Sequence, residues 1–215
     1  MSVSTSSRSR VPTSRRTQAE RRARSRSALL EAAARGLSRH GYGNLRLDEV
    51  ARDAGYSRGA LYHQFQDKED LALAVLDWAD QTWRAEVGAR VAQEPDPLLA
   101  LISLARGHAV LCRRDIARVA IALRLEFAAK EHPIGQRLEA ISEGLVERCT
   151  RLVSAGRRNG TIAKGPPARL VARALIGAVE GTVIELAGRA PHDEVLAVRA
   201  ALGVLGADPD SVQWR

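Results

Sequence analysis

The stretch LDEVARDAGYSRGALYHQF, residues Leu47–Phe65, decides the fold of this chain. Its first half has the apolar spacing of a short helix, and Gly55 ends that helix and supplies the small residue that a tight turn needs. Ser57 then suits the N-cap of a second short helix, since its hydroxyl can accept from the free amides of the next turn. Two short helices joined at a glycine turn predict a helix-turn-helix, whose second helix fits the major groove of DNA.

The residue types along these two helices suit the reading of DNA. Apolar side chains can fix the crossing of the helices, namely Val50, Ala51, Ala54, Leu61 and Phe65. Polar or basic side chains occupy the second helix, namely Ser57, Arg58, Tyr62 and His63. Arg58 is the candidate for reading a base, because a guanidinium fork can pair with O6 and N7 of guanine. The alternative is that Arg58 is a solvated surface arginine.

The rest of the chain predicts further helices and no strand. A long helix over about residues 18–40 precedes the motif, and another over about residues 68–92 follows it, with Asp67 as its N-cap. Five more helices are expected over about residues 95–112, 115–129, 133–158, 166–188 and 191–206. The sequence therefore predicts an all-α fold of nine helices.

Composition favours helix-on-helix packing and an anionic partner. The 215 residues are 45% hydrophobic but only 4% aromatic, which suits helices better than β-sandwiches. The net charge of +8 indicates nucleic acid or a membrane surface as a partner. Residues 1–26 hold one acid, Glu20, and the arginines Arg8, Arg10, Arg15, Arg16, Arg21, Arg22, Arg24 and Arg26. This asymmetry predicts a basic arm, disordered up to about residue 17.

Several classes of protein are disfavoured. Cys112 and Cys149 lack metal-ligand spacing with any histidine, so we expect free, buried thiols in a reducing cytosol. No secretory signal follows the N-terminal arginines, and no run of about 18 apolar residues indicates a transmembrane helix. The histidines are scattered and no phosphate-binding glycine loop accompanies them. We therefore expect a cytoplasmic protein that is not an enzyme and has no catalytic residues, cofactor or metal.

A longer string of residues at fixed spacings surrounds the motif. It comprises Ala32-Ala33, Gly41-Tyr42, Val50-Ala51, Ala54-Gly55, Ser57, Gly59, Leu61-Tyr62, Phe65, Lys68-Glu69 and Leu71. This string, over about residues 25–76, resembles the DNA-binding domain of the TetR family of transcriptional regulators. The resemblance implies an N-terminal three-helix helix-turn-helix DNA-binding domain joined to a larger C-terminal helical ligand-binding and dimerisation domain. The implied parts are a disordered basic arm (1–17), the helix-turn-helix domain (18–66), the ligand-binding and dimerisation domain (67–206) and a flexible tail (207–215).

The resemblance also implies a set of DNA contacts. Ser57 and Arg58 match the start of the family's recognition helix, and Tyr62 matches a tyrosine that touches the phosphate backbone. Lys68 matches a lysine at the start of the following helix, where a phosphate would satisfy both the lysine and the free amides. The full set that we expect at DNA is Arg46, Ser57, Arg58, Gly59, Tyr62, His63 and Lys68. In the alternatives, Tyr62 packs on the first helix, and the arm is a solubilising tail rather than a minor-groove contact.

Two positions depart from the family pattern. The chain has Leu45-Arg46 where the family usually has Thr or Ser at the start of the motif's first helix. A capping hydroxyl is therefore lost, and Arg46 is a candidate to replace its phosphate contact. The family often has His two residues after the tyrosine, whereas here Gln64 holds that place and His63 precedes it. Either of these two residues could face DNA.

A stripe of small and apolar residues on the eighth predicted helix indicates an interface with another helix. It consists of Leu170, Ala174, Gly177, Gly181 and Ile184. Two glycines four residues apart let a second helix approach closely. The resemblance implies that the last two helices form a four-helix homodimer interface, although the face could instead pack inside its own subunit. A two-fold dimer would place two recognition helices about 34–36 Å apart on a roughly palindromic operator.

The resemblance further implies a pocket for an unknown small molecule among the fourth to eighth helices. Polar or aromatic residues on apolar faces are the candidates, namely Trp78, Trp83, His108, Arg124 and Glu180. Each could instead be an ordinary core residue.

The expected function is that of a ligand-responsive regulator, by family default a repressor that a small molecule releases from its operator. The ligand would shift the fourth helix, which carries both Lys68 and Trp78, and so change the spacing of the recognition helices. The alternative is a sequence-independent architectural DNA-binding protein, which the basic arm would suit.

Overall fold

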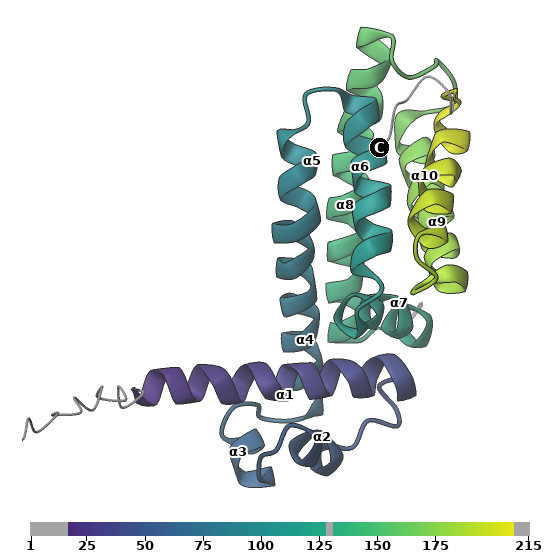
Figure 1. Cartoon of the computed structure of the whole chain (residues 1–215). Helices are drawn as coiled ribbons and strands as arrows, with labels where there is room; N and C mark the ends of the chain where they lie inside the picture. The colour runs from purple at the N-terminus through teal and green to yellow at the C-terminus, as the bar shows by residue number, and fades with distance from the viewer. Residues whose placement is uncertain (1–16, 128–130, 209–215) are drawn as a thin grey trace, which may run out of the picture.

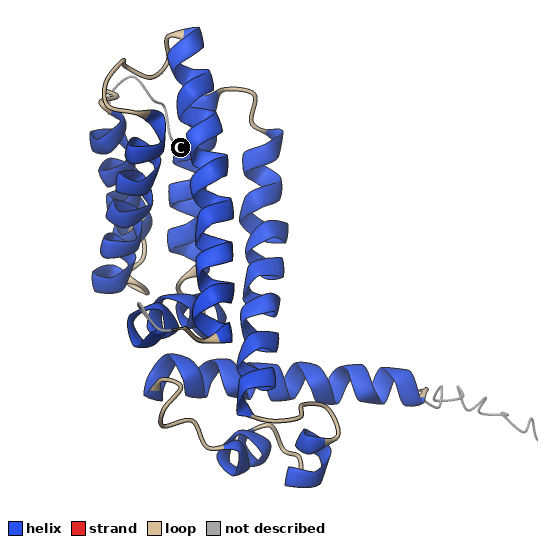
Figure 2. Cartoon of the chain, turned by 180° about the vertical axis from the view of Figure 1, so that it is seen from behind, coloured by secondary structure: helices blue, strands red, loops and turns tan. Residues whose placement is uncertain are grey.

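Figure 1 shows the computed structural model, which describes residues 17–127 and 131–208. The secondary structure of these residues is helical throughout, as predicted, and Figure 2 shows the same from behind. The first three helices are α1 (Gln18–His40), α2 (Leu47–Asp53) and α3 (Arg58–Tyr62). The bounds of α1 are those predicted, and α2 and α3 both lie within the motif Leu47–Phe65.

The long helix predicted over residues 68–92 is continuous but not regular. It consists of α4 (Lys68–Trp83), a π-helical turn η1 (Arg84–Gly88) and α5 (Ala89–Gln93). The backbone stays in the right-handed helical conformation at both junctions, and Figure 1 shows α4 and α5 as one rod. Asp67 caps this rod as predicted, because its carboxylate accepts from the Asp70 amide at 2.8 Å. Single π-helical turns are frequent at functional sites, so this irregularity marks a region of interest.

The remaining helices also begin and end within two residues of their predicted places. They are α6 (Pro97–Leu111), α7 (Asp115–Phe127), α8 (Pro133–Asn159), α9 (Ala168–Leu186) and α10 (His192–Leu205). Pro97 and Pro133 each occupy the first turn of a helix, where the missing amide costs nothing and the fixed φ favours helix. With α4, η1 and α5 counted as one rod, the described residues form nine helical segments, the number predicted.

Helices α1–α3 lie across one end of a bundle formed by the other helices. α4 starts at this end and runs along the bundle (Figures 1 and 2). One apolar cluster lies at this end and combines residues of α1–α4 with residues of α7 and the start of α8, among them the fully buried Leu61, Leu71 and Leu123. A second cluster fills the bundle. Because the first cluster joins residues on both sides of the predicted boundary at residue 66, the N-terminal helices are packed firmly onto the bundle.

Both ends of the chain extend beyond the described residues. Arg8, Arg10, Arg15 and Arg16 of the predicted arm, and residues 209–215 of the predicted tail, lie outside them. The remaining N-terminal arginines are exposed on the first turns of α1, which begins at a capping box between Thr17 and Glu20.

The two cysteines are free and buried, as predicted, and burial raises the pKa of each thiol to about 12. None of the helices formed by the described residues is long and apolar enough to cross a membrane.

Candidate nucleic-acid interface and ligand cavity

The turn between α2 and α3 is fixed by its backbone hydrogen bonds. The Tyr56 amide donates to the Ala51 carbonyl at 2.8 Å, and the Gly55 amide donates to the Arg52 carbonyl at 2.9 Å. This pair of bonds satisfies the last carbonyls of α2 and requires a left-handed residue at its centre, where Gly55 has φ +75°. The glycine that ends the first helix of the motif is therefore needed for its conformation.

The short helix α3 turns its polar residues outward. The Ser57 hydroxyl caps it, as predicted, by accepting from the Ala60 amide at 3.2 Å. Leu61 is fully buried and anchors the helix to the first apolar cluster. Tyr62 leaves 47% of its surface exposed, so it is available on the outer face rather than buried against α1. The other exposed residues of this helix and its end are Arg58, Gly59 and His63.

Gln64 and His63 line the same surface hollow but differ in exposure and in their hydrogen bonds. The Gln64 side-chain amide donates to the Ser25 hydroxyl at 2.5 Å and to the Arg22 carbonyl at 3.4 Å, so it is tied to α1. His63 is exposed and lines a surface hollow together with Arg21 and Arg22 of α1. Of the two residues that the sequence left as alternatives, His63 is the more exposed, and Gln64 is the one bonded to α1. The hollow also places two arginines beside the recognition helix that the sequence had indicated only as part of a basic arm.

Arg46 precedes α2 without capping it. Its side chain makes no capping hydrogen bond, which confirms the loss of the cap expected from the departure at this position. The guanidinium lies 3.6 Å from carboxylate oxygens of both Asp48 and Glu49, and 67% of the side chain is exposed. These two acids partly offset its charge, and they remain exposed enough for Arg46 to exchange them for a phosphate.

The loop between α1 and α2 is held by two distant helices. The Lys68 ammonium at the start of α4 donates to the Gly43 carbonyl at 3.0 Å and lies 4.6 Å from the centre of the Tyr42 ring. The Glu126 carboxylate of α7 accepts from the backbone amides of Tyr42 at 2.6 Å and Gly43 at 2.7 Å. Burial lowers the pKa of Lys68, while Glu126 opposes that shift. The loop between α1 and α2, at the end of the molecule that carries α2 and α3 (the DNA-reading end), is thus held by α4 and α7 together.

Glu126 is a residue that sequence reasoning missed. Its partners Tyr42 and Gly43 precede it by 84 and 83 residues, so no local spacing could have indicated the contact.

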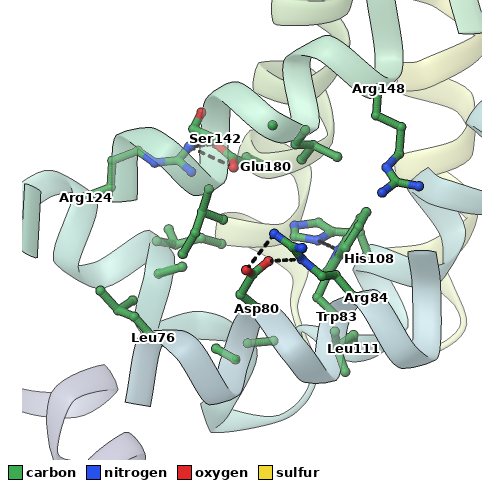
Figure 3. A pocket seen from close by; sticks show the side chains of 17 residues that line it. Leu76, Asp80, Trp83, Arg84, His108, Leu111, Arg124, Ser142, Arg148 and Glu180 are labelled. Atoms are coloured by element: carbon green, nitrogen blue, oxygen red, sulfur yellow. Dashed lines mark hydrogen bonds and ion pairs between the residues drawn. The ribbon is translucent and has the colours of Figure 1, made fainter. Parts of the chain in front are cut away.

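A cavity of about 270 Å³ lies inside the bundle, lined by residues of α4, η1, α6, α7, α8 and α9 (Figure 3). Its walls include the apolar side chains of Leu76, Ala79, Leu111, Ile121, Ile141 and Leu145. Four of the five predicted pocket residues line it, namely Trp83, His108, Arg124 and Glu180. The prediction was wrong for the fifth, Trp78. This side chain is partly buried and packs against the first apolar cluster, which α1–α4, α7 and the start of α8 form.

Polar residues of the cavity wall are paired with one another. Arg124 donates to both carboxylate oxygens of Glu180, at 2.8 and 2.6 Å, and thereby joins α7 to α9. Arg84 donates to Asp80 at 3.0 Å across one turn. The Asp80–Arg84 spacing of four residues is a signal that the sequence held and that was missed. Arg148 and Ser142 of α8 also line the cavity without having been predicted.

His108 is a neutral residue of the cavity wall whose ring nitrogens are both engaged. The Trp83 indole donates to Nδ1 at 3.2 Å, so the ring proton lies on Nε2, which is 3.5 Å from the Cys112 sulfur. Burial, with a contribution from the Arg124 charge, lowers the pKa of His108 to about 4. His108 therefore adds no charge to the cavity near neutral pH.

The predicted interface stripe on α9 faces away from its own subunit. Leu170 and Ile184 are 58% and 57% exposed, and Ala174, Gly177 and Gly181 are exposed between them. A Cβ added at Gly177 or Gly181 would meet nothing within 4 Å. The alternative that this face packs inside its own subunit is therefore wrong. Leu196 and Gly203 are exposed on α10, which lies beside α9 (Figures 1 and 2).

A capped, outward-facing second helix on a helix-turn-helix, carried by a helical bundle with an internal cavity, defines a DNA-binding regulator. The model of the family described as bacterial regulatory proteins, tetR family, matches residues 29–75, which contain the whole motif. Residues 29–75 thus form a DNA-binding domain of the TetR family of bacterial regulatory proteins, and relatives that match well beyond this domain are named as regulators.

The relatives share part of the sequence, and the solved structures share the fold. The transcriptional repressor BepR of Brucella suis is 28% identical over 177 residues, which cover 80% of this chain and 84% of that protein. The TetR-family regulator SCO4454 of Streptomyces coelicolor has a similar structure, with a TM-score of 0.71 at 24% identity over 86% of this chain and 95% of that one. AibR, solved with isovaleryl coenzyme A and operator DNA, has a TM-score of 0.70 at 22% identity, over 86% of this chain and 100% of that one.

Proposed function

We propose that the protein is a cytoplasmic, dimeric repressor that binds a palindromic operator and is released from it by a small molecule. The observation that carries this proposal is the connection between the cavity and the DNA-reading end. The same two helices, α4 and α7, line the cavity and hold the loop before α2. The repressor name of BepR and the ligand and operator bound to AibR support it by likeness.

The proposed switch acts through both helices. Trp83 of α4 is hydrogen-bonded to His108 of α6, and Arg124 of α7 is hydrogen-bonded to Glu180 of α9. A ligand that displaces Trp83 would therefore move α4, and one that displaces Arg124 would move α7. The movement would reach Gly43 through Lys68 and Glu126. Such a ligand lowers operator affinity only as far as it binds the two conformations differently, typically by about 1–3 kcal/mol. In this proposal both α4 and α7 transmit the movement from the cavity to the loop before α2.

The proposed DNA contacts are those of the exposed surface around α3. Arg58 reads a base, while Arg46, Ser57, Gly59, Tyr62, His63 and Lys68 position the helix on the backbone. Lys68 keeps donors for a phosphate, because an ammonium has three protons and, among the described residues, its bond to Gly43 uses one of them.

We expect Arg58→Ala to lower affinity for operator DNA by about 5- to 150-fold, because a bidentate arginine–guanine pair contributes about 1–3 kcal/mol. The operator is taken from upstream of the coding region or selected from a random pool. Fluorescence anisotropy at fixed salt measures affinity for this DNA and for a scrambled duplex. Affinity for the scrambled duplex should change far less.

The matched control is Arg158→Ala, which removes the same charge from the exposed end of α8, far from α3 (Figure 1). Equal losses in the two variants would remove Arg58 from the base-reading role. Equal affinity of the wild type for operator and scrambled DNA would favour the architectural DNA-binding protein instead.

We expect Glu126→Gln to loosen the loop before α2. The amide keeps one acceptor oxygen, so one of the two backbone amides now bound by Glu126 loses its partner, at a cost of about 1–3 kcal/mol. Hydrogen exchange over residues 41–46 should accelerate about tenfold, since each 1.4 kcal/mol is a factor of ten. Operator affinity should fall as well. The control Glu139→Gln, exposed on α8, should change neither, and an unchanged exchange rate in Glu126→Gln would refute the clamp.

A further inference from the structure

The charges of the cavity wall do not balance. Three arginines line it, Arg84, Arg124 and Arg148, against two acids, Asp80 and Glu180. Arg84 pairs with Asp80 and Arg124 with Glu180, while Arg148 has no acidic partner within 4.0 Å in the described part of the chain. Because His108 is neutral, the excess positive charge of the cavity is that of Arg148.

A second arginine, Arg137, also bonds to Asp80, but it does not change the net charge of the cavity wall. Arg137 donates to Asp80 at 3.1 Å, but it also pairs with Asp77 at 2.7 Å and so brings an acid of its own.

The place of Arg148 favours a ligand that supplies the missing charge. Arg148 is only partly exposed, and Figure 3 shows its side chain extending toward the half of the cavity where Trp83 and His108 lie. Leu111, Ile121 and Leu145 contribute apolar walls to the same cavity. An unpaired charge next to apolar surface is unfavourable, and a counter-ion with hydrogen-bonding oxygens relieves that cost. A guanidinium fork matches a carboxylate in geometry as well as in charge.

We propose that the effector of this cavity is a compact organic carboxylate whose charged group pairs with Arg148 and whose apolar body lies along α4, α7 and α8. This inference rests on the proposed function, because it names the chemical class of the proposed effector. One excess positive charge calls for a single negative charge, which favours a monoanion over a phosphate dianion. A volume of about 270 Å³ lies at the small end of ligand sites, which favours a body of modest size.

A competing interpretation is that Arg148 merely covers the cavity mouth. Long cationic side chains often lay their apolar stem along a surface and keep the charged head in water. In that case the charge would contribute nothing to ligand binding, and neutral and anionic molecules of one shape would bind alike.

The test compares acids with neutral molecules of the same shape. Hexanoate, octanoate and decanoate, and the three corresponding primary amides, are titrated into the full chain by calorimetry, with tryptophan fluorescence, to which Trp83 contributes, as a second signal. We expect at least one acid to bind about tenfold or more tightly than its amide, since a desolvated charge pair contributes on the order of 1.4 kcal/mol or more. No binding by any acid, or equal binding of acid and amide, overturns the proposal.

Variants of Arg148 show whether this side chain carries the preference. In Arg148→Met the preference for the acid should vanish while affinity for the amide stays, and in Arg148→Lys part of it should return. Arg151→Met removes an exposed arginine one turn further along α8 and should change nothing. A preference that survives in Arg148→Met overturns the proposal.

Operator binding is measured separately, so the two proposals can fail independently. An acid that binds through Arg148 without changing operator affinity would leave the ligand class standing and refute the switch. A neutral amide that releases the operator as well as its acid would leave the switch standing and refute the ligand class.

Discussion

Replacing Gly177 and Gly181 together by arginine is expected to yield a folded monomer with greatly reduced affinity for operator DNA. Neither glycine has a neighbour within 4 Å of an added Cβ, and the stripe around them is exposed, so the subunit itself has room for both side chains. In a two-fold dimer the same side chains would be forced against the partner helix, and like charges would meet across the axis. The subunit should therefore stay folded while the dimer dissociates.

The loss of operator affinity should be large. Linking two reading heads in one dimer raises affinity through effective concentration by about 10²–10⁴-fold, and a monomer forfeits that gain. Light scattering after size exclusion measures the mass, circular dichroism the fold, and anisotropy the operator affinity.

The control for this pair of substitutions is Ala89→Arg on α5, on the side of the bundle away from α9 and α10 (Figures 1 and 2). It should remain a dimer with unchanged affinity. A double variant of normal dimeric mass would exclude α9 as the interface.

Asp193→Ala is expected to cost about 3–5 kcal/mol of the free energy of unfolding, the range for breaking a buried ion pair by removing one partner. Asp193 is fully buried at the start of α10, and its carboxylate accepts from Arg113 at 2.7 and 2.9 Å. It also accepts from the backbone amides of Gly188 at 3.2 Å and Glu194 at 2.8 Å. This group ties the connection between α6 and α7 to the start of α10, and Arg113 would lose a principal partner.

Thermal unfolding measures this effect, and the midpoint should fall by about 10 °C for a chain of this size. Asp77→Ala is the control, because it also removes an acid paired with an arginine, but one that is 51% exposed. Exposed pairs contribute about 0–1 kcal/mol, so its effect should be small. Comparable losses in the two variants would contradict the importance assigned to burial.

The contribution of Asp193 should depend on pH in a defined direction. Hydrogen bonds from Arg113, above all, hold the pKa of this carboxyl below its ordinary value in the folded state. A group whose pKa is lowered by folding stabilises fully above its unfolded pKa, about 3.9, and this stabilisation is lost as pH falls through the folded pKa. The stability difference between wild type and Asp193→Asn should thus be constant from about pH 7 to 5 and narrow below about 4.

Local patterns predicted the helices because local physics ends them. Gly55 occupies a left-handed position, Ser57 and Asp67 accept from free amides, and Pro97 and Pro133 open helices, so each boundary is set by residues beside it. The π-helical turn within the α4–α5 rod was not predicted, since its sequence continues the helical pattern without a break. The misplaced Trp78 has a similar cause, because a tryptophan on a helix carries no sign of which of two apolar clusters it joins.

The sequence by itself determined the helix-turn-helix motif, the all-helical plan and the stripe of small and apolar residues on α9, because each depends on spacings within a single helix or turn. That this stripe faces outward was decided by the packing of the subunit. Only the tertiary structure decided which distant residues meet: Glu126 with the loop before α2, Asp193 with Arg113, and Arg124 with Glu180. It also placed Arg148 on the cavity wall with no acidic partner within 4.0 Å among the described residues. Whether a charge finds a partner depends on how helices far apart in sequence pack against one another, and no local pattern records that packing.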